Sequence, residues 1–243
     1  MSEFTTNAEA NVSAAKGVLG GYCYRAPLGT ELPDSPQWRP QTEATYELTS
    51  DTEVDNTKTY YTRSGSGTSA SPYVYAAVAS PAKANLGTYY EKIDAAWKNM
   101  GYIGENGETF GSSMTKNTFR DQNGDVIGTS TSGVDKTFGI SFAETKKAVF
   151  ESIVGADNVT DEGGVLTVHD KGPVQESYTY AWLFLLKNGR KWVRFAESAS
   201  ITEINDVQTN NSTELAWGGT FTAVKGPTTG DYFTDLFEST ETE

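Results

Sequence analysis

The chain has 243 residues, one cysteine and 32 acidic against 19 basic residues, which gives a net charge of −13. This length allows one large domain with an insertion, and a core of that size needs no disulfide or metal. The lone Cys23 excludes an intrachain disulfide and fits a reducing compartment. The acidic balance disfavours nucleic-acid binding, because phosphate contacts need a basic footprint.

The first residues lack the basic start and apolar centre of a signal peptide, and no run approaches the about 18 apolar residues of a membrane span. We therefore expect a protein that is neither exported nor membrane-spanning. Residues 1–16 carry few bulky apolar groups, which predicts a mobile arm. An apolar run from Val18 to Tyr24 predicts the first strand, and the prolines between 27 and 36 predict an extended connection.

An internal repeat occupies residues 46–90. The stretch from Tyr46 to Tyr60 matches that from Tyr75 to Tyr89 in length, and both copies end in Asn-x-x-Thr-Tyr-Tyr. The segment 64–72 between them has the composition of a flexible linker. Two copies are too few for a solenoid. We predict that each copy is a small hairpin-like unit and that residues 41–92 form a module inserted on the surface of the main domain.

The pattern changes at Ile93. Apolar residues at 93, 96, 97 and 100 have helical spacing, which predicts a short helix ended by Gly101. Residues 104–125 are polar and rich in glycine, which predicts a long loop that is mobile in the free subunit.

Strands dominate the remainder. Alternating Phe138, Ile140 and Phe142 predict a strand over 137–142, followed by an amphipathic helix that ends at Gly155. Residues 178–195 form two apolar runs separated by Asn188-Gly189, the preferred pair for a type I′ hairpin turn. The run 182–186 does not alternate, so we expect it to be covered on both faces. Further strands are predicted at 199–204 and 217–224.

These patterns predict a mainly β fold with one or two short helices. The predicted core residues are Phe138, Ile140, Phe142, Phe150, Ile153, Trp182, Phe184, Trp192, Val193 and Phe221.

The residues of catalysis and metal binding are scarce. The single histidine, His169, has no recognisable nucleophile or orienting partner, and one His with one Cys makes a zinc site improbable. Residues 121–125 (DQNGD) resemble the start of a calcium loop, but Val126 replaces its glycine and Ser132 its final glutamate. The motif therefore indicates a turn. We expect no enzymatic activity, no cofactor and no metal.

Five segments in the same order resemble the major tail protein family of flexible-tailed bacteriophages. The resemblance covers about residues 17–40 and 93–238, most of the chain. The segments are GGYCYRAPLGTELPDS (20–35), AAWKNMGYIGENGET (95–109), NGDVIGTSTSGVDKTFGISFAETKKAVFESIVG (123–155), GRKWVRFAESASITEIND (189–206) and ELAWGGTFTAVKGPTTGDYF (214–233).

The resemblance implies a β-sandwich or barrel flanked by a short helix. Six copies would form a ring by joining their sheets edge to edge, and rings would stack into a tube through which DNA passes without specific binding. The implied partners are other copies of the chain, the tape measure protein and the tail terminator, and the implied location is the virion tail, assembled in the host cytoplasm. Residues 41–92 would be a decoration, and 239–243 an acidic C-terminal tail.

Two other classes of protein remain open. One is another virion tail protein of similar fold, such as a terminator, tip or baseplate subunit. The other is a carbohydrate- or cell-wall-binding β-sandwich, which the abundance of Tyr and Trp favours.

We also predict a contact between rings in the stretch 104–125. Its apolar side chains would dock on the neighbouring ring while its charges set the register. The residues of this predicted site are Glu105, Glu108, Phe110, Met114, Lys116, Phe119 and Arg120.

Overall fold

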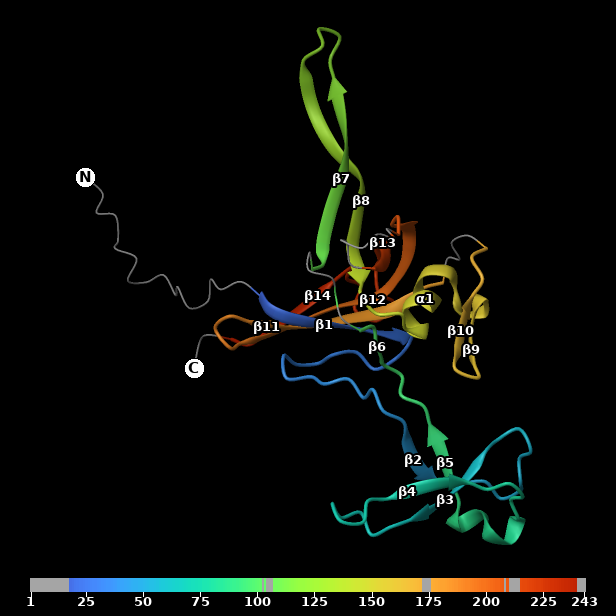
Figure 1. The fold of residues 1–243 in the computed structure, drawn as a ribbon. Coiled ribbons are helices and arrows are strands. Elements are labelled where there is room, and N and C mark those ends of the chain that lie inside the picture. Colours follow the sequence, from blue (N-terminus) through green and yellow to red (C-terminus); the bar gives the residue numbers. More distant parts are fainter. Residues whose placement is uncertain are drawn as a thin grey trace. The chain divides into compact units, whose positions relative to one another are not determined.

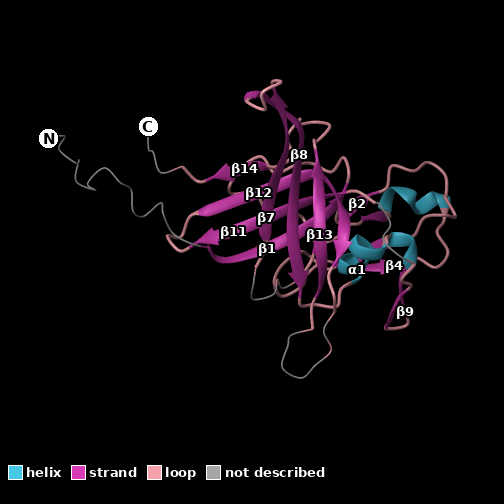
Figure 2. Cartoon of the chain, turned by 90° about the horizontal axis from the view of Figure 1, so that it is seen from above, coloured by secondary structure: helices cyan, strands magenta, loops and turns pink. Residues whose placement is uncertain are grey.

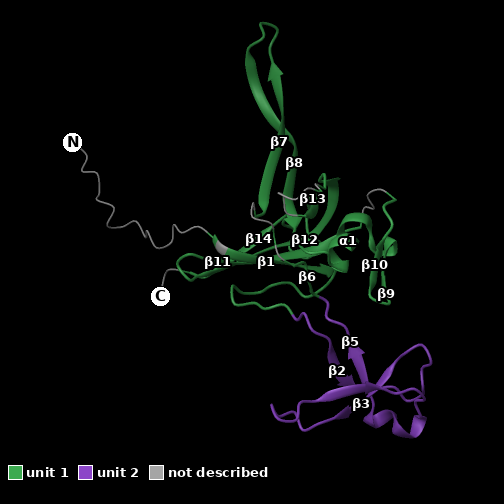
Figure 3. Cartoon of the chain, viewed as in Figure 1, with its two compact units in different colours: residues 1–40, 97–243 green, residues 41–96 purple. Residues whose placement is uncertain are grey.

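The computed structural model describes residues 18–101, 103, 107–171, 176–207, 209 and 215–239. The described chain is mainly β with antiparallel sheets, as predicted (Figures 1 and 2). It divides into two compact units, the smaller running from Gln41 to Ala96 rather than to residue 92 (Figure 3). The predicted arm at 1–16 and the tail beyond Ser239 lie outside the described residues. None of the described helices is long and apolar enough to cross a membrane.

The larger unit is built on an eight-stranded sheet in the order β6-β1-β11-β12-β13-β8-β7, with β14 beside β12. A short helix and a separate two-stranded hairpin, β9–β10, complete it. The elements are β1 (Val18–Pro27), β6 (Lys98–Asn99), β7 (Thr109–Arg120), β8 (Val126–Phe142), α1 (Lys147–Val154), η3 (Ala156–Asn158), β9 (Val159–Glu162), β10 (Val165–Val168), β11 (Tyr178–Leu186), β12 (Lys191–Ile204), β13 (Trp217–Val224) and β14 (Thr234–Phe237).

The core of this unit consists of aromatic side chains from the central strands. Phe138 stacks on Phe221 with ring centroids 4.8 Å apart, and Trp182 meets Phe138 edge to face. Helix α1 adds Phe150, which packs on Trp217. Nine of the ten predicted core residues are buried, and Trp192 is half-buried against the same cluster. The predicted helix is confirmed, and it ends at Gly155, whose φ of 88° favours glycine.

The predicted hairpin between β11 and β12 is present, but its turn differs. A type I′ turn needs positive φ at both Asn188 and Gly189, and only Gly189 has it, at 83°. The backbone N–H of Leu186 donates a hydrogen bond to the carbonyl of Arg190, which closes a three-residue loop. The part of β11 that is buried on both faces also lies earlier in the strand than predicted. Residues 179–182 are buried, whereas Leu185 is 41% exposed.

The helix predicted over 93–100 is wrong. Strand β5 (Tyr90–Ile93) of the smaller unit ends at the start of this stretch, and Lys98–Asn99 form β6, which pairs with Tyr24 and Arg25 at the edge of β1. Trp97 is buried edge to face against Trp38. A helix of eight residues has little stability of its own, so edge hydrogen bonds and burial of Trp97 decide the local structure.

Strand β12 carries an extra residue around Glu197, where its pairing with β11 shifts. On its other edge, β12 pairs with β14 before this point and with β13 after it. The Glu197 carboxylate is buried and accepts hydrogen bonds from the backbone N–H groups of Thr228 and Thr229, in the loop that joins β13 to β14. Glu197 therefore fixes the loop between β13 and β14 at the point where the partner of β12 changes from β14 to β13.

We expect Glu197→Gln to lower the free energy of unfolding by about 2 kcal/mol at pH 7, because an amide cannot replace a buried carboxylate that accepts several hydrogen bonds. Burial alone would raise the pKa of Glu197, but the bonds from Thr229 and Thr228 outweigh it and lower the pKa. The folded pKa is thus below the unfolded value of about 4.3, so this stability is present above that pH and lost as pH falls through the folded pKa. Urea unfolding at pH 7 and pH 3 should show the deficit shrinking in acid, with exposed Glu203→Gln as control.

The smaller unit is one four-stranded sheet in the order β2-β5-β3-β4. Each repeat contributes an outer and an inner strand, and the outer strand pairs with the inner strand of the other copy. The predicted hairpin within each copy is therefore wrong. Two strands alone would be marginal, whereas the exchange gives four strands over a buried cluster of Tyr60, Leu86 and Tyr89. The elements are β2 (Thr45–Leu48), β3 (Tyr60–Ser64), β4 (Val74–Ala77), η2 (Lys83–Thr88) and β5 (Tyr90–Ile93).

The pairing in this sheet has a pseudo-two-fold symmetry. Tyr46 lies opposite Lys92, and Tyr75 lies opposite Arg63. A shift of 29 positions (75 − 46 = 92 − 63) converts one pair into the other. The inner strands meet at Tyr61 and Tyr90, which the same shift exchanges. The tandem repeat has thus produced two equivalent halves of one sheet.

Candidate assembly surface

Strands β7 and β8 form a long hairpin whose outer part leaves the sheet (Figure 1). The base of β8, residues 136–142, pairs with β13, and residues 136–139 also pair with β7. Beyond it, within the described chain, β8 pairs only with β7. We call residues 112–135 the arm. The loop predicted over 104–125 is thus wrong from Thr109 to Arg120, and residues 104–106 lie outside the described chain.

A tight turn closes the tip of the arm. The Asp121 carboxylate accepts hydrogen bonds from the N–H groups of Asn123 and Asp125, and Gly124 has a φ of 84°. The Arg120 guanidinium donates to the Gly124 carbonyl at 2.7 Å. The turn predicted from DQNGD is confirmed. Among the described residues, no group of three or more acidic, His or Cys side chains is placed to hold a metal ion.

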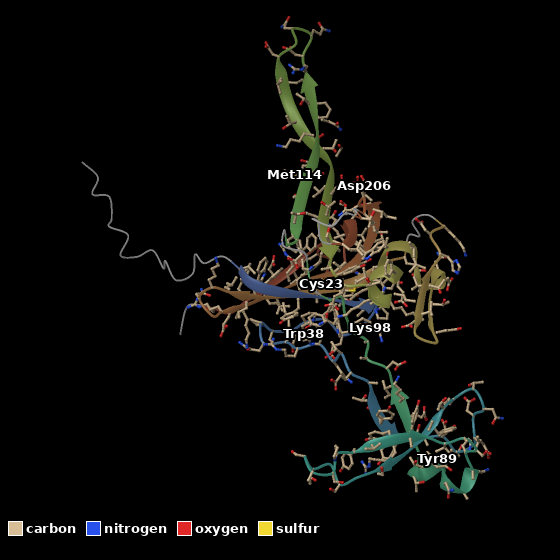
Figure 4. The ribbon with its side chains drawn as sticks, in the orientation of Figure 1. Cys23, Trp38, Tyr89, Lys98, Met114 and Asp206 are labelled. Carbon is tan, nitrogen blue, oxygen red and sulfur yellow. The ribbon has the colours of Figure 1, made fainter. Side chains whose placement is uncertain are left out.

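Large apolar side chains are exposed along the arm. Met114, Phe119 and Val126 are each more than half exposed, and Ile127 is 69% exposed. Figure 4 labels Met114 on the arm, well away from Cys23 in the main part of the unit. An isolated two-stranded hairpin is marginally stable in water, and several large apolar side chains exposed along it favour contact with a partner.

The structure separates the residues of the predicted contact site. Met114, Lys116, Phe119 and Arg120 are exposed on the arm. Phe110 instead packs edge to face on Trp182 at 5.1 Å, with the Arg194 guanidinium 4.4 Å from its ring centre. Phe110 is thus partly buried rather than exposed beside the other predicted docking side chains, because β7 enters the core at this point. Glu105 lies outside the described residues.

Glu108 lies at the base of β7 and is half-buried. Its Oε1 has no hydrogen-bond partner among the described residues, and burial raises the pKa of its carboxyl group. Burial also raises the pKa of the Cys23 thiol, with a further contribution from the charge of Glu108. Glu108 thus belongs to the interior beside Cys23 rather than to the arm.

Sequence reasoning missed the return strand of the arm. Val126, Ile127 and Val134 lie on β8, and Val134 faces Met114 across the hairpin. A signal was present in the sequence, since Asn123-Gly124 between two segments of strand-forming residues is a hairpin motif.

Among the described strands, the sheet is open at both ends. Strand β7 is the last strand at one end. At the other end, β6 covers β1 only at Tyr24 and Arg25, and in the described chain no strand pairs with residues 18–22 on that side. Unpaired edge strands present free backbone N–H and C=O groups, which can extend a sheet into a neighbouring molecule.

A hollow of about 440 Å³ lies on β1, β11 and β12, next to the open edge of β1. Tyr22, Leu183 and Trp192 contribute apolar surface to it, and Arg39 and Lys191 contribute positive charge. Such a hollow can receive an apolar side chain together with a carboxylate, and the arm carries both kinds of group.

The described residues therefore define a mainly β protein with an open-edged antiparallel sheet and a projecting arm. Comparison with known proteins adds no assignment, since no family model matches this sequence and the search of curated proteins finds no relative.

Proposed function

We propose that this chain is a major tail tube protein of a flexible-tailed bacteriophage, a structural subunit without enzymatic activity. Its larger unit would be a sandwich or barrel of the tail tube type. The observation that carries the proposal is the arm, a two-stranded projection with exposed apolar side chains on a sheet whose opposite edge is open. The ordered resemblance of the sequence segments supports it.

The arm and the open edge of β1 are different surfaces of the same molecule. A contact between them in neighbouring copies is heterologous, so it repeats and generates a ring or a filament. Pairing between the edge strands of neighbouring copies would close a ring of six. The arms would then link successive rings. The hollow beside β1, with Arg39 and Lys191, complements the acidic tip of the arm at Asp121 and Asp125.

The charge of the chain supports a role in conducting DNA. Six subunits of net charge −13 give 6 × 13 = 78 negative charges per ring. An acidic lumen repels phosphate, so DNA would pass without adhering. The assembled tube would be part of the virion and would contact the tape measure protein in its lumen and the terminator at its end.

Electron microscopy of the purified full chain tests the proposal. Tubes are the expected result. Single rings would favour a terminator, tip or baseplate subunit of similar fold, and monomers at every concentration would overturn the assembly role.

We expect Phe119→Ser combined with Ile127→Ser to abolish tube formation. Both side chains are more than half exposed, so their removal deletes contact surface without opening a cavity. The melting temperature of the dispersed protein should stay close to that of the parent, because exposed substitutions change stability by about 0.5 kcal/mol or less. Sedimentation and microscopy measure assembly, and circular dichroism measures stability.

Val165→Ser is the matched control, since Val165 is 62% exposed on β10, outside the arm. It should leave tubes intact. Tubes formed equally well by the arm variant and the control would show that the arm does not carry the contact.

A further inference from the structure

One face of the sheet in the smaller unit carries four tyrosines whose rings contact one another in the order Tyr61, Tyr46, Tyr75, Tyr90. The two central rings are stacked, with centroids 3.9 Å apart and planes 4° from parallel. Tyr61 meets Tyr46 edge to face at 5.2 Å, and Tyr90 meets Tyr75 in the same way at 5.3 Å. The shift of 29 positions exchanges these two contacts. We call these four residues the tyrosine row.

Two cations, Arg63 and Lys92, lie on the same face as the tyrosine row. The Arg63 guanidinium is 4.8 Å from the ring centre of Tyr90 and 4.4 Å from that of Tyr73. Within the described chain, no carboxylate lies within ion-pair distance of Arg63. Its counterpart in the repeat, Lys92, is exposed and pairs with Asp94 at 2.6 Å. Both cations project from the same face as the row, because they lie opposite Tyr75 and Tyr46.

The hydroxyl groups distinguish this face from the core of the unit. On the core side, the Tyr60 hydroxyl donates to Asp51 at 2.6 Å, and the Tyr89 hydroxyl accepts from the N–H of Ala82. The hydroxyls of the tyrosine row form no hydrogen bond with any described residue. Buried tyrosines normally use their hydroxyls, so four rigidly packed rings with free hydroxyls are suited to bind an outside molecule.

We propose that the tyrosine row, with Arg63 and Lys92, binds an anionic polysaccharide. The hydroxyls can donate to and accept from the hydroxyls of sugar rings, and the two cations can bind carboxylate or phosphate groups along the chain. The stacked rings hold these groups in place before binding, so little conformational entropy is lost. This inference does not depend on assembly into tubes.

The size of the face favours a glycan over a protein. Four strands of four or five residues span roughly 15 Å by 15 Å, or about 200 Å², at the usual strand spacing and rise. A standard protein interface needs about 800 Å² from each partner. A nucleic acid is disfavoured, because two cations neutralise few backbone phosphates and the chain has a net charge of −13.

Affinity electrophoresis of the full chain tests the inference, with polygalacturonate as the carboxylate probe, phosphorylated mannan as the phosphate probe and dextran as the neutral control. We expect retention by at least one anionic polymer and none by dextran. Tyr46→Phe with Tyr75→Phe keeps the stacked rings and removes two hydroxyls, and it should weaken binding about tenfold. Arg63→Gln should weaken it by a similar factor.

Two variants control for these changes. Lys83→Gln removes an exposed charge elsewhere in the smaller unit, and Tyr232→Phe removes a hydroxyl from the larger unit. Both should bind within about twofold of the parent, and all variants should melt like the parent by circular dichroism. The inference is overturned if neither anionic polymer is retained, or if Lys83→Gln weakens binding as much as Arg63→Gln. Equal binding of single-stranded DNA with the same dependence on Arg63 would replace the glycan by a nucleic acid.

Discussion

Trp182→Ala is expected to lower the free energy of unfolding of the larger unit by about 3–5 kcal/mol, because it leaves a large cavity in the core. Trp182 is fully buried on β11, and its ring meets Phe138 at 4.7 Å and Phe110 at 5.1 Å, both edge to face. Phe110 belongs to the base of β7. The substitution should therefore loosen the attachment of the arm as well as the core.

Tryptophan fluorescence in urea measures this effect selectively. All five tryptophans lie outside the smaller unit, at 38, 97, 182, 192 and 217, so their signal reports on the larger unit alone. Trp182→Phe is the matched control. The indole N–H of Trp182 has no hydrogen-bond partner among the described residues, so replacing it with an apolar ring offsets part of the lost packing. An alanine variant as stable as the phenylalanine variant would contradict this placement of Trp182.

Arg25→Met is expected to cost about 3 kcal/mol of stability, because it leaves a carboxylate beside the core without its main partner. Arg25 is 5% exposed on β1 and forms an ion pair with Glu151 of α1. Its guanidinium also donates to the Ser152 hydroxyl at 3.2 Å and lies 4.2 Å from the ring centre of Tyr178. These contacts attach the helix to the first strand.

The double variant Arg25→Met with Glu151→Leu separates the two causes of this loss. If the unpaired carboxylate is responsible, the double variant should recover to within about 1 kcal/mol of the parent, because an apolar pair of similar size often replaces a buried ion pair without loss. Lys147 lies 3.8 Å from Glu151 and partly compensates its charge, which places the expected cost at the lower end of the usual range. If the double variant is as unstable as Arg25→Met, packing of the arginine side chain is the cause.

Local sequence patterns were sufficient to predict an element where the periodicity of its residues matches the face that is buried. Phe138, Ile140 and Phe142 alternate and are buried on one face of β8, and α1 follows from the helical spacing that ends at Gly155. The hairpin between β11 and β12 follows from two apolar runs around a turn pair. In each case the residues that specify the element also make its main contacts.

The candidate sites were predicted only in part. The predicted contact site included Met114 and Phe119, which lie exposed on the arm, but the return strand with Ile127 was not recognised. Phe110 was placed with them because it lies in the same polar stretch. Its burial on Trp182 depends on where β7 joins the sheet, which no local pattern in that stretch contains. The tyrosine row depends on exchange of strands between repeats, and the repeat pattern alone favours a hairpin in each copy.

The sequence by itself determined the mainly β class, the repeat at 46–90, most of the core and the lack of a recognisable catalytic or metal-binding motif. These depend on composition and on patterns that can be read along the chain without knowledge of its contacts. Only the tertiary structure decided that residues 98–99 are an edge strand rather than part of a helix, that 109–120 form the first strand of the hairpin that carries the arm, and that the repeats exchange strands. The edge strand and the exchange of strands rest on hydrogen bonds between segments far apart in the chain, and the position of the hairpin depends on the pairing of β8 with β13. Such contacts outweigh local preferences of a few tenths of a kcal/mol per residue.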